Sequence, residues 1–296
     1  MNEKYKIRED YQIEAKDEFD AISESVKMDG ETIEYINRYV GEKTHGQIND
    51  MVDESLINDS TKLAAINALY FNSVWGNGVW DDCLIDFNYT VSNEIKKVSA
   101  MSNNFNIKTY FEDSGFEGFT CGYMLDDIVF VGFMPKDNSD FELTGNEIRS
   151  VANKIKDIYS NLKNDEEFFF DAFCTVYMPQ ITAEQETDLV DILQSTGFTL
   201  PFNSISANFT KIYEGNKTNA SIDVLKQKSK IDINNVGTTA SAVTISSVTF
   251  GDILEDYEPP KPDKVLIFDH PYAFMIYDTA SDQILFIGKV VDPKHE

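Results

Sequence analysis

The C-terminal stretch VLIFDHPYAFMIYDTASDQILFIGKVVDP limits what this chain can fold into more than any other segment. Two apolar runs, residues 272–277 and 284–291, flank a polar turn at residues 278–282. Each run is too short to span a membrane and too apolar for an exposed edge, so the pattern predicts a buried β-hairpin. Pro271 cannot donate a ladder hydrogen bond and therefore marks the entry to this hairpin.

Composition bounds the class of protein and its partners. With 296 residues, 42% of them hydrophobic, the chain can bury a substantial core as one large domain or two ordinary ones. The net charge of −26 argues against nucleic acid and anionic membranes as partners. No run of eighteen apolar residues occurs, so we expect no membrane span.

The cysteines and the first residues bear on the compartment. Cys83, Cys121 and Cys174 are odd in number and widely spaced, which predicts buried free thiols rather than a disulfide framework or a zinc site. The first nineteen residues are charged throughout and do not form a signal peptide. The compartment therefore stays open.

Helices are predicted where apolar residues recur at helical spacing. Residues 3–28 fit one or two amphipathic helices, residues 31–40 fit a helix ended by Gly41 and Gly46, and residues 147–162 fit another. A further helix is expected after Thr182, because Gln185 three residues on completes a capping box. Gly197 closes that helix, and its buried face comprises Leu189, Val190, Ile192 and Leu193.

Strands are predicted from apolar runs bounded by turn residues. Residues 63–71 suit a strand covered on both faces, and Trp75 with a Gly-Asn-Gly turn at 76–78 follows it. Three more strands are expected at residues 127–134, 167–178 and 222–235. After residue 235 the chain becomes free of charge, then acidic, then rich in proline, which predicts an exposed loop.

The C-terminal hairpin resembles the signature of the serpins, protease inhibitors that act once and change fold as they act. Leu266, Asp269, His270 and Pro271 match that signature. Tyr272 replaces its Phe and Lys289 replaces its Arg.

Other segments resemble serpin landmarks in the family's order. Residues 36–48 resemble the helix lying across the main sheet, and residues 63–75 resemble the central strand of that sheet with a Trp at its top. Residues 176–181 resemble the strand leading to the next helix, and residues 222–235 resemble the strand feeding the reactive loop. The resemblance implies an α+β serpin fold with a large mixed β-sheet, flanking helices, a C-terminal hairpin core and an exposed reactive loop at about residues 237–263. It implies one domain over residues 1–296, shortened at the N-terminus either as a fragment or as a reduced serpin.

The sheet-opening region of the family maps onto Asn67, Gln227 and Trp75. The family often pairs an Asn on the central strand with a His on its neighbour, and here Gln227 takes the place of the His. An Asn–Gln pair can exchange hydrogen bonds, but it cannot change charge near neutral pH.

Serpin inhibition requires a loop that can become a buried strand, so every second side chain must fit a packed interior. Residues 236–250 carry no charge in a chain with 26% charged residues. Gly237 is the expected hinge, where the backbone bends in one state and straightens in the other. The insertion face is expected to present Thr238, Ala240, Ala242, Thr244, Ser246 and Val248.

Loop length points to the scissile bond. In the family, the target protease usually cleaves after the fourteenth residue beyond the hinge. In this chain that residue is Gly251, which is flanked by Phe250 and Asp252. Counting back from the C-terminal signature points nearer to Tyr257. Phe250 or Tyr257 would suit a chymotrypsin-like protease and Asp252 an Asp-specific one. No Lys or Arg lies between Lys230 and Lys261, which disfavours trypsin-like targets.

Other chemistry finds little support. The three histidines, His45, His270 and His295, accompany no G-x-S-x-G elbow, and no phosphate-binding glycine loop occurs. We therefore expect a protein that is not an enzyme and needs no cofactor or metal.

Two functions remain open. The first is a monomeric suicide inhibitor of a serine or cysteine endopeptidase, extracellular by resemblance although a cytoplasmic location stays open. The second is a non-inhibitory or degenerate serpin that acts as a binding or decoy protein.

Overall fold

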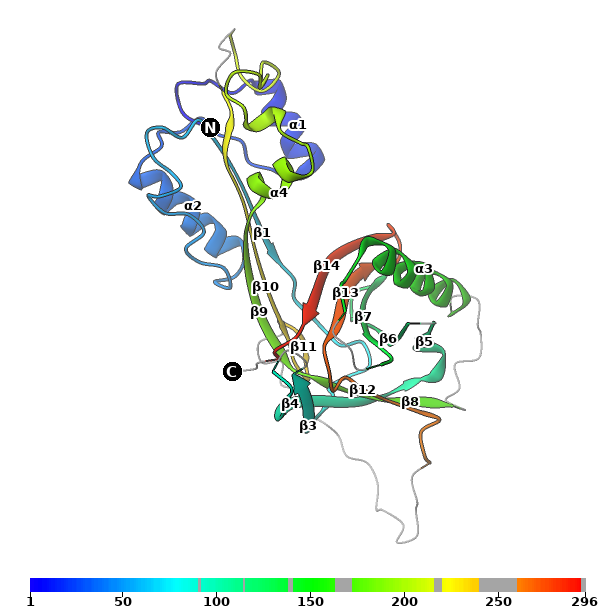
Figure 1. Ribbon diagram of the computed structural model, residues 1–296. Coiled ribbons are helices and arrows are strands. Elements are labelled where there is room, and N and C mark those ends of the chain that lie inside the picture. The colour runs from blue at the N-terminus through cyan, green and yellow to red at the C-terminus, as the bar shows by residue number, and fades with distance from the viewer. Residues whose placement is uncertain are drawn as a thin grey trace. The chain divides into compact units, whose positions relative to one another are not determined.

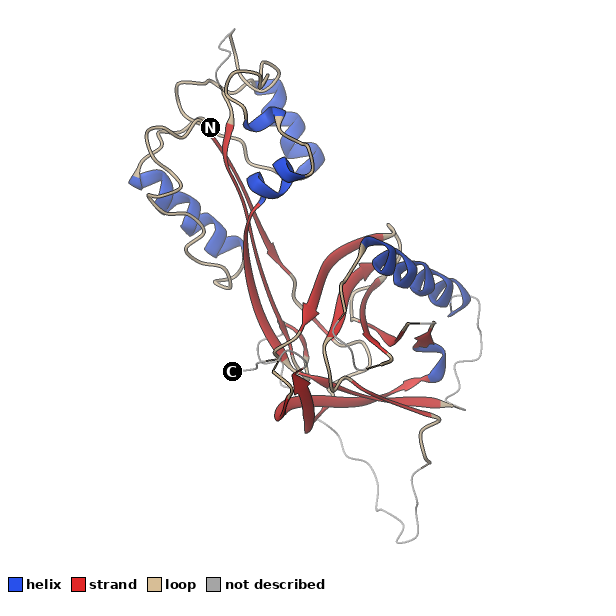
Figure 2. Cartoon of the chain, in the orientation of Figure 1, coloured by secondary structure: helices blue, strands red, loops and turns tan. Residues whose placement is uncertain are grey.

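The computed structural model describes residues 1–89, 92–113, 115–137, 141–162, 172–215, 220–239 and 260–293 (Figures 1 and 2). The chain forms two compact units, one of Met1–Tyr70 with Ala183–Lys230 and the other of Phe71–Thr182 with Ile231–Glu296. Within the described ranges, no helix has the length and apolarity needed to cross a bilayer.

The first unit pairs two long parallel strands. β1 (Leu63–Tyr70) and β10 (Ile222–Ile233) run side by side, with Leu63 opposite Ile222 and Tyr70 opposite Lys230. β9 (Ile181–Asp188) also pairs with β10. The helices of this unit are α1 (Glu9–Phe19), α2 (Gly30–Lys43), α4 (Leu189–Ser195) and the short η2 (Leu200–Phe202).

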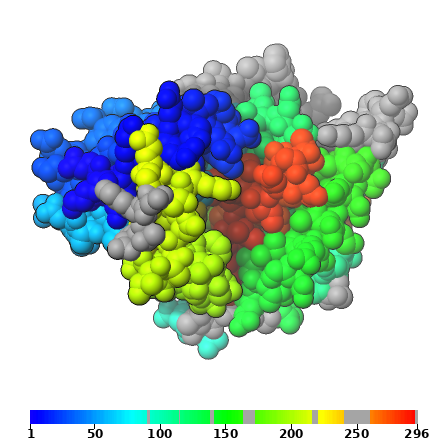
Figure 3. Space-filling model, turned by 90° about the horizontal axis from the view of Figure 1, so that it is seen from above, coloured from blue at the N-terminus to red at the C-terminus, as the bar shows by residue number. Residues whose placement is uncertain are grey.

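Segments that are far apart in the sequence contact each other in this unit. Ile7 forms an antiparallel bridge with Tyr213, and the Lys6 ammonium lies 2.8 Å from the Glu214 carboxylate. Figure 3 shows the blue N-terminal segment against the yellow-green segment of the same unit. Of residues 3–28, only Glu9–Phe19 are helical, and the helix ends at Asp20, which has left-handed backbone with a φ of +50°.

α2 confirms the helix expected from residues 31–40 and is longer than that. Asp29 caps its start, and its carboxylate accepts a hydrogen bond from Thr32 N at 3.3 Å. The helix runs through Gly41 to Lys43, so Gly41 does not end it. The helix ends at Thr44, and the chain turns through His45 and Gly46, which have φ values of +53° and +77°.

β1 confirms the expected strand, but not its burial on both faces. Its side chains are half-buried and that of Asn67 is exposed. The alternating residues Ala64, Ile66 and Ala68 pack on the cluster that includes Val40 of α2. Because α2 covers one face of a strand whose side chains alternate, the run of apolar residues does not imply two covered faces.

The expected capping box at Thr182 is wrong. Residues up to Asp188 belong to β9, and α4 begins at Leu189, where Asp188 accepts a hydrogen bond from Val190 N at 2.9 Å. Strand pairing with β10 overrides the local capping pattern here. Gly197 does follow the helix with a φ of +92°, as expected.

The buried face expected of this helix is also wrong. Ile192 is 49% exposed, and no residue of α4 is buried. The other three predicted members of that face, Leu189, Val190 and Leu193, are half-buried.

The second unit holds two antiparallel-rich sheets and one long helix. One sheet has the order β12-β8-β4-β3 and the other the order β14-β13-β7-β6-β5. α3 (Gly145–Leu162) contributes Val151 and Ile155 to a core shared with the second sheet. The remaining elements are β2 (Ser73–Val74), β3 (Asp81–Tyr89), β4 (Glu94–Asn106), η1 (Ile107–Thr109), β5 (Tyr110–Glu112), β6 (Phe116–Gly122), β7 (Ile128–Pro135), β8 (Phe173–Pro179), β11 (Gly237–Thr238), β12 (Lys264–Ile267), β13 (Tyr272–Asp278) and β14 (Gln283–Val290).

The C-terminal hairpin is confirmed, and its two strands differ in burial. β13 lies between β14 and β7, and its residues from Tyr272 to Tyr277 are all buried. β14 is the edge strand, where Leu285 and Ile287 are 38% and 41% exposed. The expectation of burial therefore holds for β13 alone, since an edge strand has a neighbour on one side only.

Candidate hinge and strand seam

The predicted hinge begins a short strand. After β10 the chain turns through residues 234–236, and Gly237 and Thr238 form β11. Thr238 pairs antiparallel with Ile233 of β10 and also with Ser73 of β2, while Gly237 pairs with Val74. The first two residues of the predicted loop thus already lie between β2 and the end of β10, which belongs to the second unit from Ile231 onward.

The turn before β11 is held by side chains on both sides. The Asn234 carboxamide oxygen accepts hydrogen bonds from Val236 N at 2.9 Å and Gly237 N at 3.2 Å, as in an Asx turn. The Trp75 indole donates to Asn234 O at 2.8 Å, and Trp75 N donates to Val236 O at 3.1 Å. Trp75, expected in the sheet-opening region, therefore contacts the hinge turn directly.

Gly237 is required by close approach of the backbones. A Cβ atom at this position would lie 2.2 Å from Ser73 O and 2.7 Å from Val74 Cα, both of which are main-chain atoms. No L side chain fits that space without moving a strand.

Thr238 is fully buried, and its hydroxyl lies 2.5 Å from the Tyr123 hydroxyl. The Tyr123 ring stacks on Trp75 with centroids 4.9 Å apart. Burial raises the pKa of Tyr123 well above its usual range, so the phenol stays protonated and available as a donor.

The seam between β1 and β10 is closed in the first unit. All residues from Ala64 to Tyr70 have a partner on β10, and Asn67 lies opposite Gln227. The Asn67 Nδ2 donates to Gln227 Oε1 at 3.3 Å, which joins the two residues predicted to pair. The bond is solvent-exposed, so water competes for both groups and the bond alone contributes little to closure.

The rest of the predicted site lies outside the described residues. This applies to the insertion-face residues Ala240, Ala242 and Thr244 and to the scissile-bond candidates Phe250, Gly251, Asp252 and Tyr257. Their roles stay predictions.

Two groups at the hinge were missed by the sequence analysis. The Asn234-Asn235 pair carries a recognisable turn signal, and Asn235 Nδ2 donates to Asp82 Oδ2 at 3.1 Å. Tyr123 carries no local signal, because its contact with Thr238 spans 115 positions of sequence.

The surroundings of the three cysteines and of His270 fit structural roles for these residues. Cys121 and Cys174 are buried, and desolvation raises the pKa of the Cys174 thiol to about 11, while Cys83 is half-buried. The His270 ring lies 2.8 Å from Pro135 O through Nε2 and 2.8 Å from Asp269 Oδ1 through Nδ1. These contacts tie the start of the C-terminal hairpin to the end of β7.

Comparison with known proteins decides the family. The family described as "Serpin (serine protease inhibitor)" matches residues 1–293. The chain belongs to the serpin family. It is 29% identical over 300 residues to an uncharacterized serpin-like protein of Methanosarcina acetivorans, covering 99% of this chain and 66% of that protein.

Two further serpins extend the comparison. Mouse leukocyte elastase inhibitor A is 25% identical over 260 residues, covering 87% of this chain and 65% of the inhibitor. A serpin of the insect Tenebrio molitor has the same fold, with a TM-score of 0.74 and 24% identity over 99% of this chain and 74% of that structure. This serpin chain spans about two thirds of the length of the curated relatives it matches.

Proposed function

We propose that this serpin inhibits an endopeptidase as a suicide substrate. The single observation that carries the proposal is the placement of Gly237 and Thr238 as a strand between β10 and β2. The loop that follows them would continue that strand once Thr239, whose φ of +52° ends it, becomes extended. In the same antiparallel register Ala240 would lie opposite Ile231, Ala242 opposite Ser229 and Thr244 opposite Gln227.

Those three loop residues are small and uncharged, so the inserted strand would bury no charge. The Asn67–Gln227 bond and the backbone ladder between β1 and β10 would have to open to admit it. An inserted strand would then have partners on both sides, which satisfies its backbone hydrogen bonds in full. This gain in pairing is the source of the free energy for the change.

Inhibition would follow from the timing of this change. The nucleophile of the target attacks the carbonyl of Gly251, or of a neighbouring loop residue, and the amine of the next residue leaves. The acyl-enzyme is then carried about 50 Å as roughly 15 residues extend at about 3.3 Å each. Distortion of the oxyanion hole stops deacylation. The chain contributes stored folding free energy and no catalytic group.

The protease specificity belongs to the same proposal. The absence of Lys and Arg between Lys230 and Lys261 favours a target that is not trypsin-like. Phe250 and Tyr257 fit a chymotrypsin-like serine protease, and Asp252 fits an Asp-specific cysteine protease.

Covalent capture tests the proposal directly. The chain is incubated with chymotrypsin, elastase, cathepsin G, a caspase and trypsin, and then boiled and run on a denaturing gel. We expect an adduct with at least one of the first four and none with trypsin. Thr238→Arg should abolish the adduct, since Thr238 is fully buried, whereas Thr238→Val keeps the shape and should retain it.

Loop cleavage tests insertion without any target. A non-specific protease nicks the loop, and the melting temperature is compared before and after. We expect the melting temperature to rise by about 10 °C or more. At about 2–4 °C per kcal/mol for a chain of this size, a 10 °C rise corresponds to about 2.5–5 kcal/mol of added stability. If the melting temperature stays constant and no adduct forms, the proposal fails.

A non-inhibitory binding or decoy role is the second candidate. A departure from the family pattern favours it: Gln227 stands where the family often has a His, so the pair with Asn67 cannot change charge near neutral pH. An unchanged melting temperature after cleavage would support this role.

A further inference from the structure

The Gly-Asn-Gly turn at residues 76–78 carries a chemically reactive sequence. Asn77 is followed directly by Gly78, and this is the one Asn-Gly pair in the chain. In such a pair the backbone nitrogen of the glycine can attack the side-chain carbonyl of the asparagine, because glycine has no Cβ atom to obstruct the approach. The turn between β2 and β3 therefore holds both groups of an intramolecular reaction.

The structure leaves both groups accessible. Asn77 is exposed, and within the described residues no hydrogen bond holds its carboxamide. Apart from its chain neighbours, no atom lies within 4 Å of the position that a Cβ atom of Gly78 would take. The Gly78 amide donates to Trp75 O at 3.3 Å, which is beyond the usual range of about 2.7–3.2 Å and makes this bond weak.

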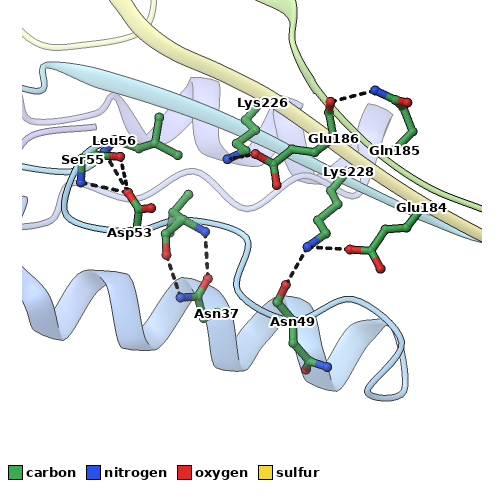
Figure 4. A network of polar contacts seen from close by, with 11 residues as sticks. Asn37, Asn49, Asp53, Ser55, Leu56, Glu184, Gln185, Glu186, Lys226 and Lys228 are labelled. Atoms are coloured by element: carbon green, nitrogen blue, oxygen red, sulfur yellow. Dashed lines mark hydrogen bonds and ion pairs between the residues drawn. The ribbon is translucent and has the colours of Figure 1, made fainter.

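Other asparagines of the chain are held or hindered. The Asn37 carboxamide donates to Val52 O at 2.8 Å and accepts from Val52 N at 3.0 Å, and Figure 4 shows it held in this way. Asn72 is exposed like Asn77, but the residue after it is Ser73, which has a Cβ atom and belongs to β2. Asn72 is therefore a matched control five positions before the reactive pair.

Both ends of the turn are fastened to the hinge turn at residues 234–236. At its start, the Trp75 indole and the Trp75 backbone nitrogen donate to carbonyls of the hinge turn at 2.8 and 3.1 Å. At its end, Trp80 N donates to Asn235 O at 2.8 Å. The two indole rings are buried, with centroids 5.3 Å apart. The chain between Trp75 and Trp80 therefore has a length that matches two fixed ends.

We propose that Asn77 is a site of spontaneous deamidation and that its conversion to isoaspartate loosens the hinge. The Gly78 backbone nitrogen loses its proton to solvent base and forms a bond to Asn77 Cγ. The Cγ–Nδ2 bond breaks, and the leaving nitrogen takes a proton from solvent and departs as ammonia. Water then opens the succinimide ring. Opening at the backbone carbonyl of Asn77 gives isoaspartate, and opening at Cγ gives aspartate.

The two products differ in the length of the backbone. In isoaspartate the chain runs through Cβ and Cγ of residue 77, which adds one methylene to the turn, whereas aspartate leaves the backbone unchanged. Both products add the same negative charge. Because both ends of the turn are fixed, the extra methylene displaces a buried tryptophan or breaks a bond to the hinge turn. Either change loosens β11 in its place between β10 and β2.

This modification goes beyond the proposed function, because it alters the uncleaved chain whether or not a protease is captured. Ageing of the intact protein in mildly alkaline buffer tests the site. Isoaspartate should accumulate at residue 77, as detected by peptide mapping and by labelling with a protein isoaspartyl methyltransferase and S-adenosylmethionine. Asn72 should stay unmodified in the same samples.

Asn77→Gln should form no isoaspartate at this position, because ring closure through the longer side chain of glutamine is slow. Absence of isoaspartate at residue 77 of the aged wild type would overturn the inference. Equal amounts at residues 72 and 77 would overturn it too, since the glycine would then have no effect.

Intrinsic fluorescence reports on the hinge, because Trp75 and Trp80 are the two tryptophans of the chain. Both are buried, so ageing of the wild type should shift the emission to longer wavelength. Amides of residues 236–238 should exchange about tenfold faster with solvent, which corresponds to about 1.4 kcal/mol. Amides of β13 in the same unit should keep their rates.

Fresh Asn77→Asp carries the added charge without the methylene and should match the fresh wild type in both measurements. Unchanged emission and exchange in a sample with isoaspartate at residue 77 would contradict the effect on the hinge. The same changes in aged Asn77→Gln would assign them to ageing elsewhere in the chain, and the full effect in fresh Asn77→Asp would assign it to charge. Either result would refute the role of the longer backbone.

Discussion

At the scale of single residues, Gly237 and Thr238 serve two requirements at once. The sequence analysis assigned Gly237 to the hinge for its freedom to bend, and the structure adds that its backbone passes too close to Ser73 O for any Cβ atom. Thr238 meets the opposite demand, because it fills a buried site and shares a hydrogen bond with Tyr123.

Tyr272 supplies a prediction at the same scale. Its ring is 1% exposed, and its hydroxyl has no hydrogen-bond partner among the described residues. A buried polar group without a partner costs about 1–3 kcal/mol. Tyr272→Phe, which places the signature residue of the family there, should raise the free energy of unfolding by about 1 kcal/mol, measured by urea denaturation.

Tyr277→Phe is the matched control on the same strand. The Tyr277 hydroxyl donates to the Asp282 carboxylate, so its removal loses a bond and should lower the free energy of unfolding. Destabilisation by Tyr272→Phe as well would show that the Tyr272 hydroxyl has a partner after all.

At the scale of elements, α2 depends on its cap. The Asp29 carboxylate accepts hydrogen bonds from the Lys27 side chain and from Thr32 N. Both contacts lower the pKa of Asp29 below the ordinary 3.8, and the contact with Lys27 has the larger effect. A depressed folded-state pKa means that Asp29 stabilises the fold fully above about pH 4 and loses this effect as the pH falls through the folded value. Asp29→Ala should therefore lower the melting temperature at pH 7.

The difference in melting temperature between Asp29→Ala and the wild type should shrink as the pH falls from about 4 through the lower pKa of Asp29 in the folded state. Thermal melts followed by circular dichroism from pH 7 to pH 2.5 measure it. Asp29→Asn keeps a capping oxygen without the charge and should show a smaller difference at pH 7. A pH-independent deficit in Asp29→Ala would refute the electrostatic part of the argument.

At the scale of the whole molecule, the excess of negative charge lowers the stability of the fold. With 51 acidic and 25 basic residues, the folded chain repels itself. Raising the salt concentration from about 0.01 M to about 1 M shortens the screening length from about 30 Å to about 3 Å. The melting temperature should therefore rise with sodium chloride, as measured by scanning calorimetry.

Potassium chloride at the same ionic strength should give the same rise, because screening does not depend on the cation. A melting temperature that falls with salt would mean that attractive ion pairs, such as Lys228–Glu184, outweigh the repulsion.

The sequence by itself determined the elements whose signals are local. The hairpin of β13 and β14, the helices α2 and α3 and the strand β1 follow from apolar periodicity and turn residues. The pairing of Asn67 with Gln227, which are 160 positions apart, was expected instead from the family resemblance. Only the tertiary structure decided what depends on distant neighbours. Pairing with β10 made residues 182–188 a strand rather than a capped helix, and one-sided cover by α2 left Asn67 exposed. Lys228 reaches Asn49 across 179 positions of sequence, and burial and partners of that kind are set by how the chain folds back on itself.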